Sequence, residues 1–564
     1  MAITTGIPRL QKASSGHWEL LVDGEPYLIL GAELQNSSMS SARFMDTIWQ
    51  NLKDMGINTV LGAVAWEDVE PKEGLFNFTE LDGVIAGARA YGLRLIILWF
   101  GSFKNGRSSY TPTWVKTNPK RFPRMYKKNN EDRLQNSGVL SIFHDECVKA
   151  DTKAFSSLLQ HLRETDEERT VIMVQVENEV GFHGDSRDRS AVATRLFESP
   201  VPNDVIQFLN DDWDSLHIDL KSKYPKFKKT VDQIKAGGST GNWEDYFGRS
   251  MWTEELFMAY HYALYLEKIA SSGRKVYEIP LFSNVWLPQP GEPGAASGGG
   301  KPGEYPSGGA TSTVLDIWLK FAPHLDFISP DIYHNAYTET CSIYTHRGQP
   351  LFIPEQRRDH FGARTAWTAI GNFHALGVSP FGIDTQTAKE AAFTDHYKLL
   401  GSVSKHILET RRKNLSVTGF CFHDPEDENN PCPPFTVSFK HYNVTVSRAF
   451  VLGKEGSGYG MIVELEPSKF LLIGKGFKVE WKSNSLTHSY TEILRFEEKS
   501  VIDKETQELR TDRILNGDES RSGIWANMPN DDPDHGECPV PVIIPARTAI
   551  AQVEIFSLEN EEQL

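Results

Sequence analysis

Short apolar runs alternate with amphipathic segments of helical spacing from residue 27 to residue 411. The apolar runs lie at residues 27–31, 58–62, 93–98, 171–177, 279–283, 327–330, 351–354 and 378–383. The amphipathic segments lie at residues 41–55, 81–91, 150–164, 312–322, 363–376 and 395–411. Eight buried strands alternating with helices predict an α/β fold of the (β/α)8, or TIM-barrel, type. The alternative is an open doubly wound sheet, but no Gly-rich phosphate loop follows the first run to support it.

Two insertions and a change of pattern divide the chain further. Residues 183–260 are charged and partly helical, and residues 287–311 are rich in Pro, Gly and Ser. In a barrel both insertions follow the C-terminal ends of strands, on the face where active sites form. After residue 413 short alternating segments are bounded by turn residues. We therefore predict a barrel over residues 1–413 and an all-β sandwich over residues 414–564.

Two of the predicted strands end on carboxylates. The run that begins at Val171 reaches Glu177 and Glu179, and the run that begins at Leu351 reaches Glu355. Side chains alternate along a strand, so Glu177 and Glu179 are expected on one side of the first run. A buried carboxylate is costly unless it is paired, hydrogen-bonded or used in chemistry.

Glycoside hydrolysis needs two carboxyl groups that flank the scissile bond. We predict that Glu179 and Glu355 are this pair, although strand position alone does not choose Glu179 over Glu177. Arg357 and Arg358 follow Glu355 and are candidates to keep it charged. The plain alternative is that Glu355 only forms a salt bridge with one of these arginines.

Composition excludes some classes of partner. The formal net charge of -16 argues against nucleic acid or an anionic membrane surface as a partner. The sequence shows no membrane span, no secretory leader and no disulfide framework, so a cytoplasmic protein is expected unless a leader was removed. Residues 144–147 lack a spaced metal-ligand partner, and no cofactor or metal is expected. A homo-oligomer remains open.

Three motifs resemble glycoside hydrolase family 35, which contains retaining β-galactosidases with a barrel fold. Residues 175–181, Gln-Val-Glu-Asn-Glu-Val-Gly, are similar to the family signature Gln-x-Glu-Asn-Glu-Tyr-Gly. Residues 65–78 are similar to its Trp-Asn-x-His-Glu-Pro-x-x-Gly-x-Phe-x-Phe stretch. Residues 31–38 look like a subgroup with an appended C-terminal β domain.

The resemblance assigns roles to individual residues. It implies that Glu179 is the acid/base and Glu355 the nucleophile. It also implies that Asn178 binds the sugar 2-hydroxyl and that Tyr333 donates its hydroxyl to Glu355. The alternative for Tyr333 is packing at the barrel rim.

The chain also departs from the family pattern. Residues 98–106 contain no carboxylate where typical members carry Ala-Glu-Trp, and Val180 replaces the signature Tyr. The polar candidates for binding the sugar in this chain are Gln35, Lys104, Asn105 and Glu177. The candidates for stacking against the sugar ring are Trp66, Trp99 and Trp286. Each Trp has the alternative role of packing at the barrel mouth.

The expected function is that of a retaining, exo-acting β-galactosidase on oligosaccharides, with xyloglucan fragments as a family-suggested substrate. A carboxyl separation of about 5–5.5 Å is expected, whereas a gap near 8 Å indicates an inverting enzyme. The alternatives are a retaining β-glucosidase or transglycosylase and, in another class, a non-catalytic sugar-binding barrel.

Overall fold

The computed structural model describes residues 6–129, 131–238, 240–290, 298–425, 427, 432–449, 456–529 and 547–559. Eight parallel strands form one sheet in the order β11-β10-β9-β6-β5-β4-β13-β12. Their bounds are β4 Ile29–Glu33, β5 Thr59–Ala65, β6 Arg94–Lys104, β9 Val171–Asn178, β10 Leu281–Trp286, β11 Phe327–Asp331, β12 Ile353–Gln356 and β13 Gly377–Pro380. A parallel bridge between Ile332 and Gln356 joins the two ends of this order and closes the barrel. The predicted TIM-barrel fold is confirmed.

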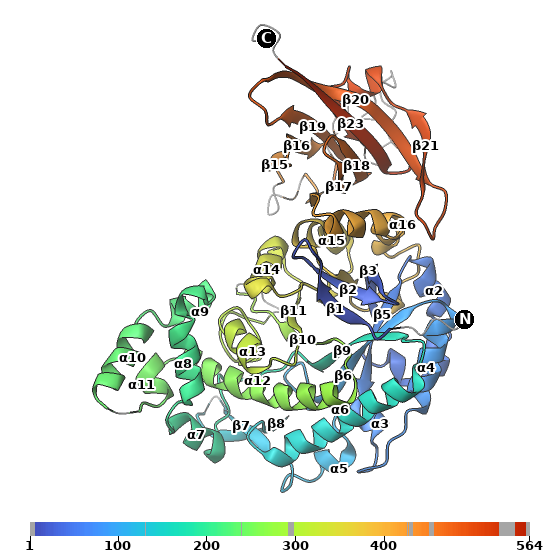
Figure 1. The fold of residues 1–564 in the computed structure, drawn as a ribbon. Coiled ribbons are helices and arrows are strands. Elements are labelled where there is room, and N and C mark those ends of the chain that lie inside the picture. The colour runs from blue at the N-terminus through green and yellow to red at the C-terminus, as the bar shows by residue number, and fades with distance from the viewer. Residues whose placement is uncertain are drawn as a thin grey trace.

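Helices follow every strand of the barrel, as Figure 1 shows. The helices outside the insertion are α1 Ala42–Met45, α2 Trp49–Asp54, α3 Trp66–Val69, α4 Thr79–Ala90, α5 Thr113–Lys116, α6 Asp145–Thr165, α12 Met251–Val276, α13 Leu315–Phe321, α14 Tyr337–Tyr344, α15 His360–Phe373 and α16 Phe393–Arg412. Helix α12 begins at Met251, inside the interval expected as an insertion, because its apolar face packs on α6 and α13 as a barrel helix.

Side chains of β6 alternate between two hydrophobic cores. Leu95 and Ile97 belong to the large core between the strands and the helices, whereas Ile96 and Leu98 belong to a smaller core of inward-pointing strand residues. This is the period of two that a strand with two buried faces produces. The smaller core also includes Leu20 of β2 (Trp18–Val22), so the N-terminal sheet formed by β1 (Arg9–Lys12), β2 and β3 (Glu25–Tyr27) packs against the barrel interior.

The segment after β9 carries five additional helices, which extend to one side of the barrel in Figure 1. They are α7 Ala191–Glu198, α8 Asn203–Asp211, α9 Ile218–Lys223, α10 Phe227–Ala236 and α11 Trp243–Phe247. A hairpin that the sequence pattern did not indicate, β7 (Arg124–Lys128) with β8 (Leu134–Leu140), follows β6. Of the second expected insertion, residues 291–297 lie outside the described residues.

The C-terminal region is built from two antiparallel sheets. One contains β14 Val417–Phe422, β17 Gly458–Glu466, β18 Lys469–Lys475, β20 His488–Val501, β21 Leu509–Ile514 and β23 Ile550–Glu559; the other contains β15 Phe435–Ser438, β16 Tyr442–Arg448, β19 Phe477–Ser483 and β22 Trp525–Met528. Leu472 and Val553 of the first sheet share a core with Val444 and Val479 of the second, which is the predicted sandwich.

The sandwich packs on the outer helices of the barrel, above α15 and α16 in Figure 1. Asn372 Oδ1 accepts hydrogen bonds from Thr418 Oγ1 and Gly419 N, and Gln507 Nε2 donates to Gly401 O. These contacts join the sandwich to the helices that follow β12 and β13, on the outside of the barrel.

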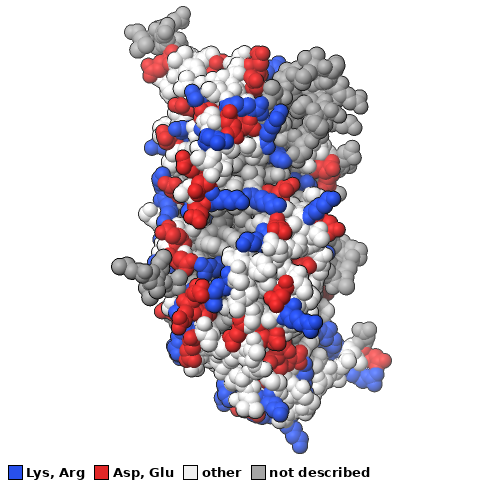
Figure 2. Space-filling model, turned by 90° about the vertical axis from the view of Figure 1, so that its right-hand side faces the viewer, with Lys and Arg blue, Asp and Glu red and all other residues white. Residues whose placement is uncertain are grey.

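Acidic and basic side chains are interspersed on the face that Figure 2 shows. The excess of acidic residues therefore forms no single region on that face. Among the described residues, none of the helices combines the length and the hydropathy that crossing a membrane requires.

Candidate active site

The end of β9 has an unusual backbone. Glu177 and Glu179 have φ values of 60° and 44°, in the left-handed region that non-glycine residues rarely adopt. Asn105 N donates to Asn178 O and Gly106 N donates to Glu179 O, so the loop after β6 holds these peptides. Strained backbone that is held in this way is typical of functional sites.

This backbone breaks the alternation expected along the strand. The Glu177 carboxylate accepts hydrogen bonds from Ser102 N (3.0 Å) and Phe103 N (2.6 Å) and is fully buried. Burial, together with the negative charge of Asp151 on α6, raises the pKa of Glu177 well above its usual value. Glu177, on β9, therefore joins this strand to β6 through hydrogen bonds. Its expected role in binding sugar is wrong.

Glu179 and Glu355 converge at the C-terminal end of the barrel. One carboxylate oxygen each from Glu179, Glu355 and Asp331 lie within 4.8 Å of one another. The side chains of Glu179 and Glu355 are 5% and 8% exposed. Asn105 Nδ2 donates to Glu179 Oε2, and Tyr333 donates its hydroxyl to Glu355 Oε1. The Tyr333 contact that the resemblance implied is therefore present.

Lys104 places one positive charge among several carboxylates. Burial alone would lower the pKa of Lys104, but the charges of Glu355, Glu179, Glu33 and Asp331 outweigh it and raise the pKa. Lys104 Nζ also donates to Asn178 Oδ1 over 2.9 Å. The buried cation beside Glu355 therefore comes from β6 and not from the arginines that follow Glu355.

Those two arginines have other partners. Arg357 pairs with Asp359, with Nη2 and Oδ2 2.5 Å apart. Arg358 Nη1 donates to Gly382 O. The expectation that these residues keep Glu355 charged is wrong, and so is the alternative of a simple salt bridge at the strand end.

Glu179 has the environment of a general acid. Burial, followed by the negative charge of Glu355, raises the pKa of Glu179 to about 7, although Lys104 and the Asn105 hydrogen bond act in the opposite direction. A carboxyl group with this pKa holds a proton near neutral pH and can also release it. The negative charge that acts on Glu179 is that of Glu355.

Three further polar residues meet at this site, and the sequence analysis did not single them out. Glu33 ends β4 and Asp331 ends β11, and burial together with the Glu355 charge raises the pKa of both well above the usual value. Asn284 of β10 donates from Nδ2 to Asp331 Oδ2 (2.7 Å) and accepts from Glu179 N (2.8 Å). Their positions in the sequence could have pointed to them, because each residue lies at or near the C-terminal end of a predicted strand, where barrel active sites form.

The loop around Ser307 forms hydrogen bonds with the chain just beyond Glu179. Phe182 and Ser307 exchange two backbone hydrogen bonds of 2.8 and 2.9 Å. Buried Glu255 on α12 accepts hydrogen bonds from Tyr305 Oη (2.8 Å) and Thr313 Oγ1 (3.0 Å), which lie on either side of that contact along the chain. Burial raises the pKa of Glu255 to about 7.

The three predicted aromatic platforms differ in exposure. Trp66 and Trp99 are fully buried, and their indole N–H groups donate to Glu70 and Asp151. A fully buried indole offers no face to a sugar, so both are packing residues and the stacking expectation for them is wrong. Trp286 ends β10 opposite Asp331 and is half-buried, so it remains a candidate platform.

Two further sugar contacts were expected from polar side chains. Gln35 is exposed just beyond β4, and its amide lies near Gly382. Asn178 is fully buried, and its Nδ2 has no hydrogen-bond partner among the described residues. A buried amide donor that is left unpaired is costly unless a ligand accepts its hydrogen bond.

The three clustered oxygens of Glu179, Asp331 and Glu355 are near enough to share a cation. Lys104 already supplies positive charge to the same carboxylates. We therefore interpret the cluster as acid–base machinery.

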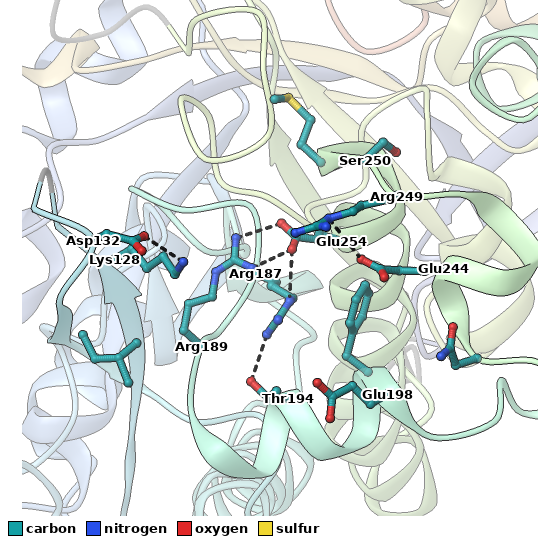
Figure 3. A pocket seen from close by; sticks show the side chains of 14 residues that line it. Lys128, Asp132, Arg187, Arg189, Thr194, Glu198, Glu244, Arg249, Ser250 and Glu254 are labelled. Atoms are coloured by element: carbon teal, nitrogen blue, oxygen red, sulfur yellow. Dashed lines mark hydrogen bonds and ion pairs between the residues drawn. The ribbon is translucent and has the colours of Figure 1, made fainter.

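A separate cavity of about 730 Å3 lies between the β7–β8 hairpin and the start of α12 (Figure 3). Glu254 pairs there with Arg187 and Arg189, at 3.2 and 2.5 Å. The residues that line this cavity include neither Glu179 nor Glu355, so the carboxylates at the barrel end remain the candidate site.

Two family models match parts of the chain. Residues 38–233 match a model described as β-galactosidase, of the glycoside hydrolase 42 type, and residues 393–527 match a domain of unknown function, DUF5597. The first match spans the strands from β5 to β9, including Glu179. The motifs above resemble family 35, whereas this model carries the number 42.

One curated relative and several solved structures are similar. A β-galactosidase from Xanthomonas manihotis is 27% identical over 199 residues, 34% of this chain and only 30% of that protein's length. A β-galactosidase structure from Bacillus circulans sp. alkalophilus has a TM-score of 0.45 and 14% identity over 68% of this chain and 57% of that chain. A β-amylase catalytic domain from Paenibacillus polymyxa has a TM-score of 0.44 and 13% identity over 65% of this chain and 96% of that chain. The family model and the relative support a glycoside hydrolase that is similar to β-galactosidases.

Proposed function

We propose that the protein is a retaining, exo-acting β-galactosidase that removes terminal β-galactosyl residues from oligosaccharides. The observation that carries this proposal is the convergence of Glu179 and Glu355, with one oxygen of each within 4.8 Å of the other. Retaining enzymes hold their two carboxyl groups about 5–5.5 Å apart, and inverting enzymes leave about 6.5–9.5 Å for a water molecule. The close approach of the oxygens supports the retaining geometry.

The first chemical step uses both carboxyl groups. Glu179 donates its proton to the glycosidic oxygen while Glu355 attacks the anomeric carbon, so the leaving sugar departs as an alcohol and a glycosyl ester forms at Glu355. In the second step Glu179 takes a proton from water, and the water oxygen attacks the anomeric carbon and displaces Glu355. Formation of the ester neutralises Glu355, and this favours the ionised form of Glu179 that the second step requires.

The polar residues around the pair are suited to binding the terminal sugar. The unpaired Nδ2 of Asn178 is a donor for the 2-hydroxyl, a contact that strengthens in the transition state. Typical relatives bind sugar hydroxyls with a carboxylate after the third strand, and in this chain Lys104 and Asn105 occupy that segment. Glu33 of the first strand supplies a buried carboxylate that interacts with Glu355 and Lys104, and we assign it to the sugar hydroxyls.

A panel of nitrophenyl glycosides tests this function. The purified protein is expected to release nitrophenol from the β-galactoside faster than from the β-glucoside, and Glu355→Gln is expected to release none from either. Faster cleavage of the glucoside would support the β-glucosidase alternative. That alternative is considered because residues 98–106, at the end of the third strand, lack the carboxylate of typical relatives. If the parent protein cleaved no glycoside but bound galactosides, the non-catalytic alternative would hold.

A further inference from the structure

A second cavity has a volume of about 470 Å3. Its walls come from residues 287–290 after β10, residues 334–336 after β11, Ser312 and helix α14. This volume is within the range of about 300–1,000 Å3 that is typical of small-ligand pockets.

Two of the residues that line the cavity directly follow residues of the proposed active site in the sequence. Leu287 follows Trp286, the last residue of β10, and His334 follows Tyr333, whose hydroxyl donates to Glu355. Strands β10 and β11 are neighbours in the barrel, with Trp286 opposite Asp331. The cavity therefore belongs to the same end of the barrel as the carboxylates.

The order of the strands indicates on which side of the scissile bond the cavity lies. Strands β10 and β11 lie between β9, which leads to Glu179, and β12, which carries Glu355. Two of the buried polar groups assigned to the terminal sugar, Glu33 and Lys104, come from β4 and β6 in the other part of the barrel. A glycoside with its terminal ring among those polar groups extends its leaving group toward β10 and β11.

The lining suits a neutral sugar. Apolar side chains such as Pro288 and Ile343 offer surface to the C–H faces of a ring, whereas Gln289, Asn335 and Glu339 offer amide and carboxylate groups to hydroxyls. The described lining includes no Lys or Arg, which an anionic ligand would require.

We propose that this cavity binds the leaving-group sugars of an oligosaccharide substrate. The inference rests on the proposed function, because it identifies the second half of the substrate of the same site. It implies that the enzyme prefers galactosyl oligosaccharides over galactosides with a small aglycone.

Cavity variants and two substrates test the proposal. The variants are Ile343→Ala and the milder double variant Gln289→Ala/Glu339→Ala, and the control is Leu134→Ala in the separate cavity of Figure 3. For a galactosylated xyloglucan oligosaccharide, kcat/KM is expected to fall about ten-fold or more in the cavity variants, since lost pocket contacts commonly cost that much. For nitrophenyl β-galactoside, kcat/KM is expected to change less than about two-fold, since its small aglycone makes few of these contacts. The control is expected to match the parent on both substrates.

Binding to the inactive Glu355→Gln protein keeps the two proposals distinguishable. Titration calorimetry is expected to show weaker binding of the oligosaccharide when a cavity substitution is added. If the parent cleaves nitrophenyl galactoside but the cavity variants bind and cleave the oligosaccharide as the parent does, the cavity proposal is overturned and the proposed function stands. Equal losses on both substrates would also overturn it. Absence of both cleavage and binding would overturn both proposals.

Discussion

Lys104 Nζ donates a 2.9 Å hydrogen bond to Asn178 Oδ1, and this contact joins the third barrel strand to the residue before Glu179. The bond fixes which way the Asn178 amide points and leaves its Nδ2 without a partner among the described residues. The same ammonium group interacts with Glu179 and Glu355. Lys104 therefore links the orientation of the proposed sugar contact, Asn178, to the charge balance of the proposed catalytic pair.

Replacing Lys104 with Met is expected to lower kcat/KM by roughly 100-fold, the loss typical of one buried electrostatic contact to a reacting group. Because the Lys104 charge lowers the pKa of Glu179, the alkaline limb of the pH profile should move to higher pH. The pH dependence of kcat/KM for nitrophenyl galactoside measures both effects. Lys116→Met, at a surface ion pair with Glu67, is the control and should leave the profile unchanged. A profile for Lys104→Met that coincides with the parent's would refute the electrostatic role.

The pH profile of the parent enzyme follows from the proton on Glu179. Its pKa, raised to about 7, means that the free enzyme holds the catalytic proton below pH 7 and loses it as the pH rises through that value. We expect kcat/KM for a galactoside with a poor leaving group to fall on the alkaline side with an apparent pKa near 7. Activity that stays constant to pH 9 would contradict this assignment of the acid.

Glu179→Gln is expected to distinguish substrates by their leaving groups. Substrates that need protonation should lose about 10²–10⁴-fold in rate, because that is the usual contribution of a general acid. Release of dinitrophenol, which needs no proton, should be much less affected in the first turnover. Rapid-quench measurement of the first turnover with both aglycones checks this, and Glu177→Gln is the comparison. If the Glu177 variant discriminated by leaving group and the Glu179 variant did not, the acid would be misassigned.

Two tryptophan variants test the difference in exposure at the barrel end. Trp286→Ala should raise KM several-fold and leave the melting temperature close to that of the parent, because Trp286 is half-buried. Trp66→Ala should destabilise the fold by about 3–5 kcal/mol, the usual cost of truncating a fully buried aromatic residue. Thermal denaturation and steady-state kinetics on both proteins provide the measurement. The reverse pattern would show that the ring at 66 is the platform.

Glu255 is expected to make stability depend on pH. Its pKa is raised by burial to about 7, so its contribution to stability is complete below the unfolded pKa, about 4.5, and is lost as the pH rises through about 7. The isosteric Glu255→Gln removes this titration, and relative to the parent it should gain on the order of 3 kcal/mol between pH 5 and pH 8. Melting temperatures of both proteins at these two pH values give the comparison. A constant difference in melting temperature would mean that Glu255 is ionised in the folded protein.

Hydrophobic periodicity was sufficient to predict the eight barrel strands, because each strand is buried and short and is followed by a segment of helical spacing. The two strand ends that carry Glu179 and Glu355 were identifiable because a carboxylate at the end of a buried strand requires an explanation. The choice of Glu179 over Glu177 came from the resemblance of residues 175–181 to a family signature. The role of Glu177 was not predictable, because the positive φ values at 177 and 179 break the strand alternation on which the prediction relied.

The remaining residues of the site depend on tertiary structure. Glu33 and Asp331 are nearly 300 residues apart in sequence, and only closure of the barrel brings both to Glu355. The burial of Trp99 likewise follows from the packing of α6 on β6, which aims its indole at Asp151. Motif spacing carries no information on such contacts.

We assign Glu355 as the group that attacks the sugar and Glu179 as the group that protonates the leaving group. Incubation with a 2-deoxy-2-fluoro-β-galactoside, which slows hydrolysis of the glycosyl ester, followed by mass spectrometry of the digested protein, tests this assignment most directly. We expect one fluorogalactosyl group, esterified to Glu355, with parallel loss of activity. A label on another residue such as Glu33 or Asp331 would show that Glu355 is not the nucleophile. Turnover with no ester and an inverted first-formed sugar would show that the enzyme does not retain configuration.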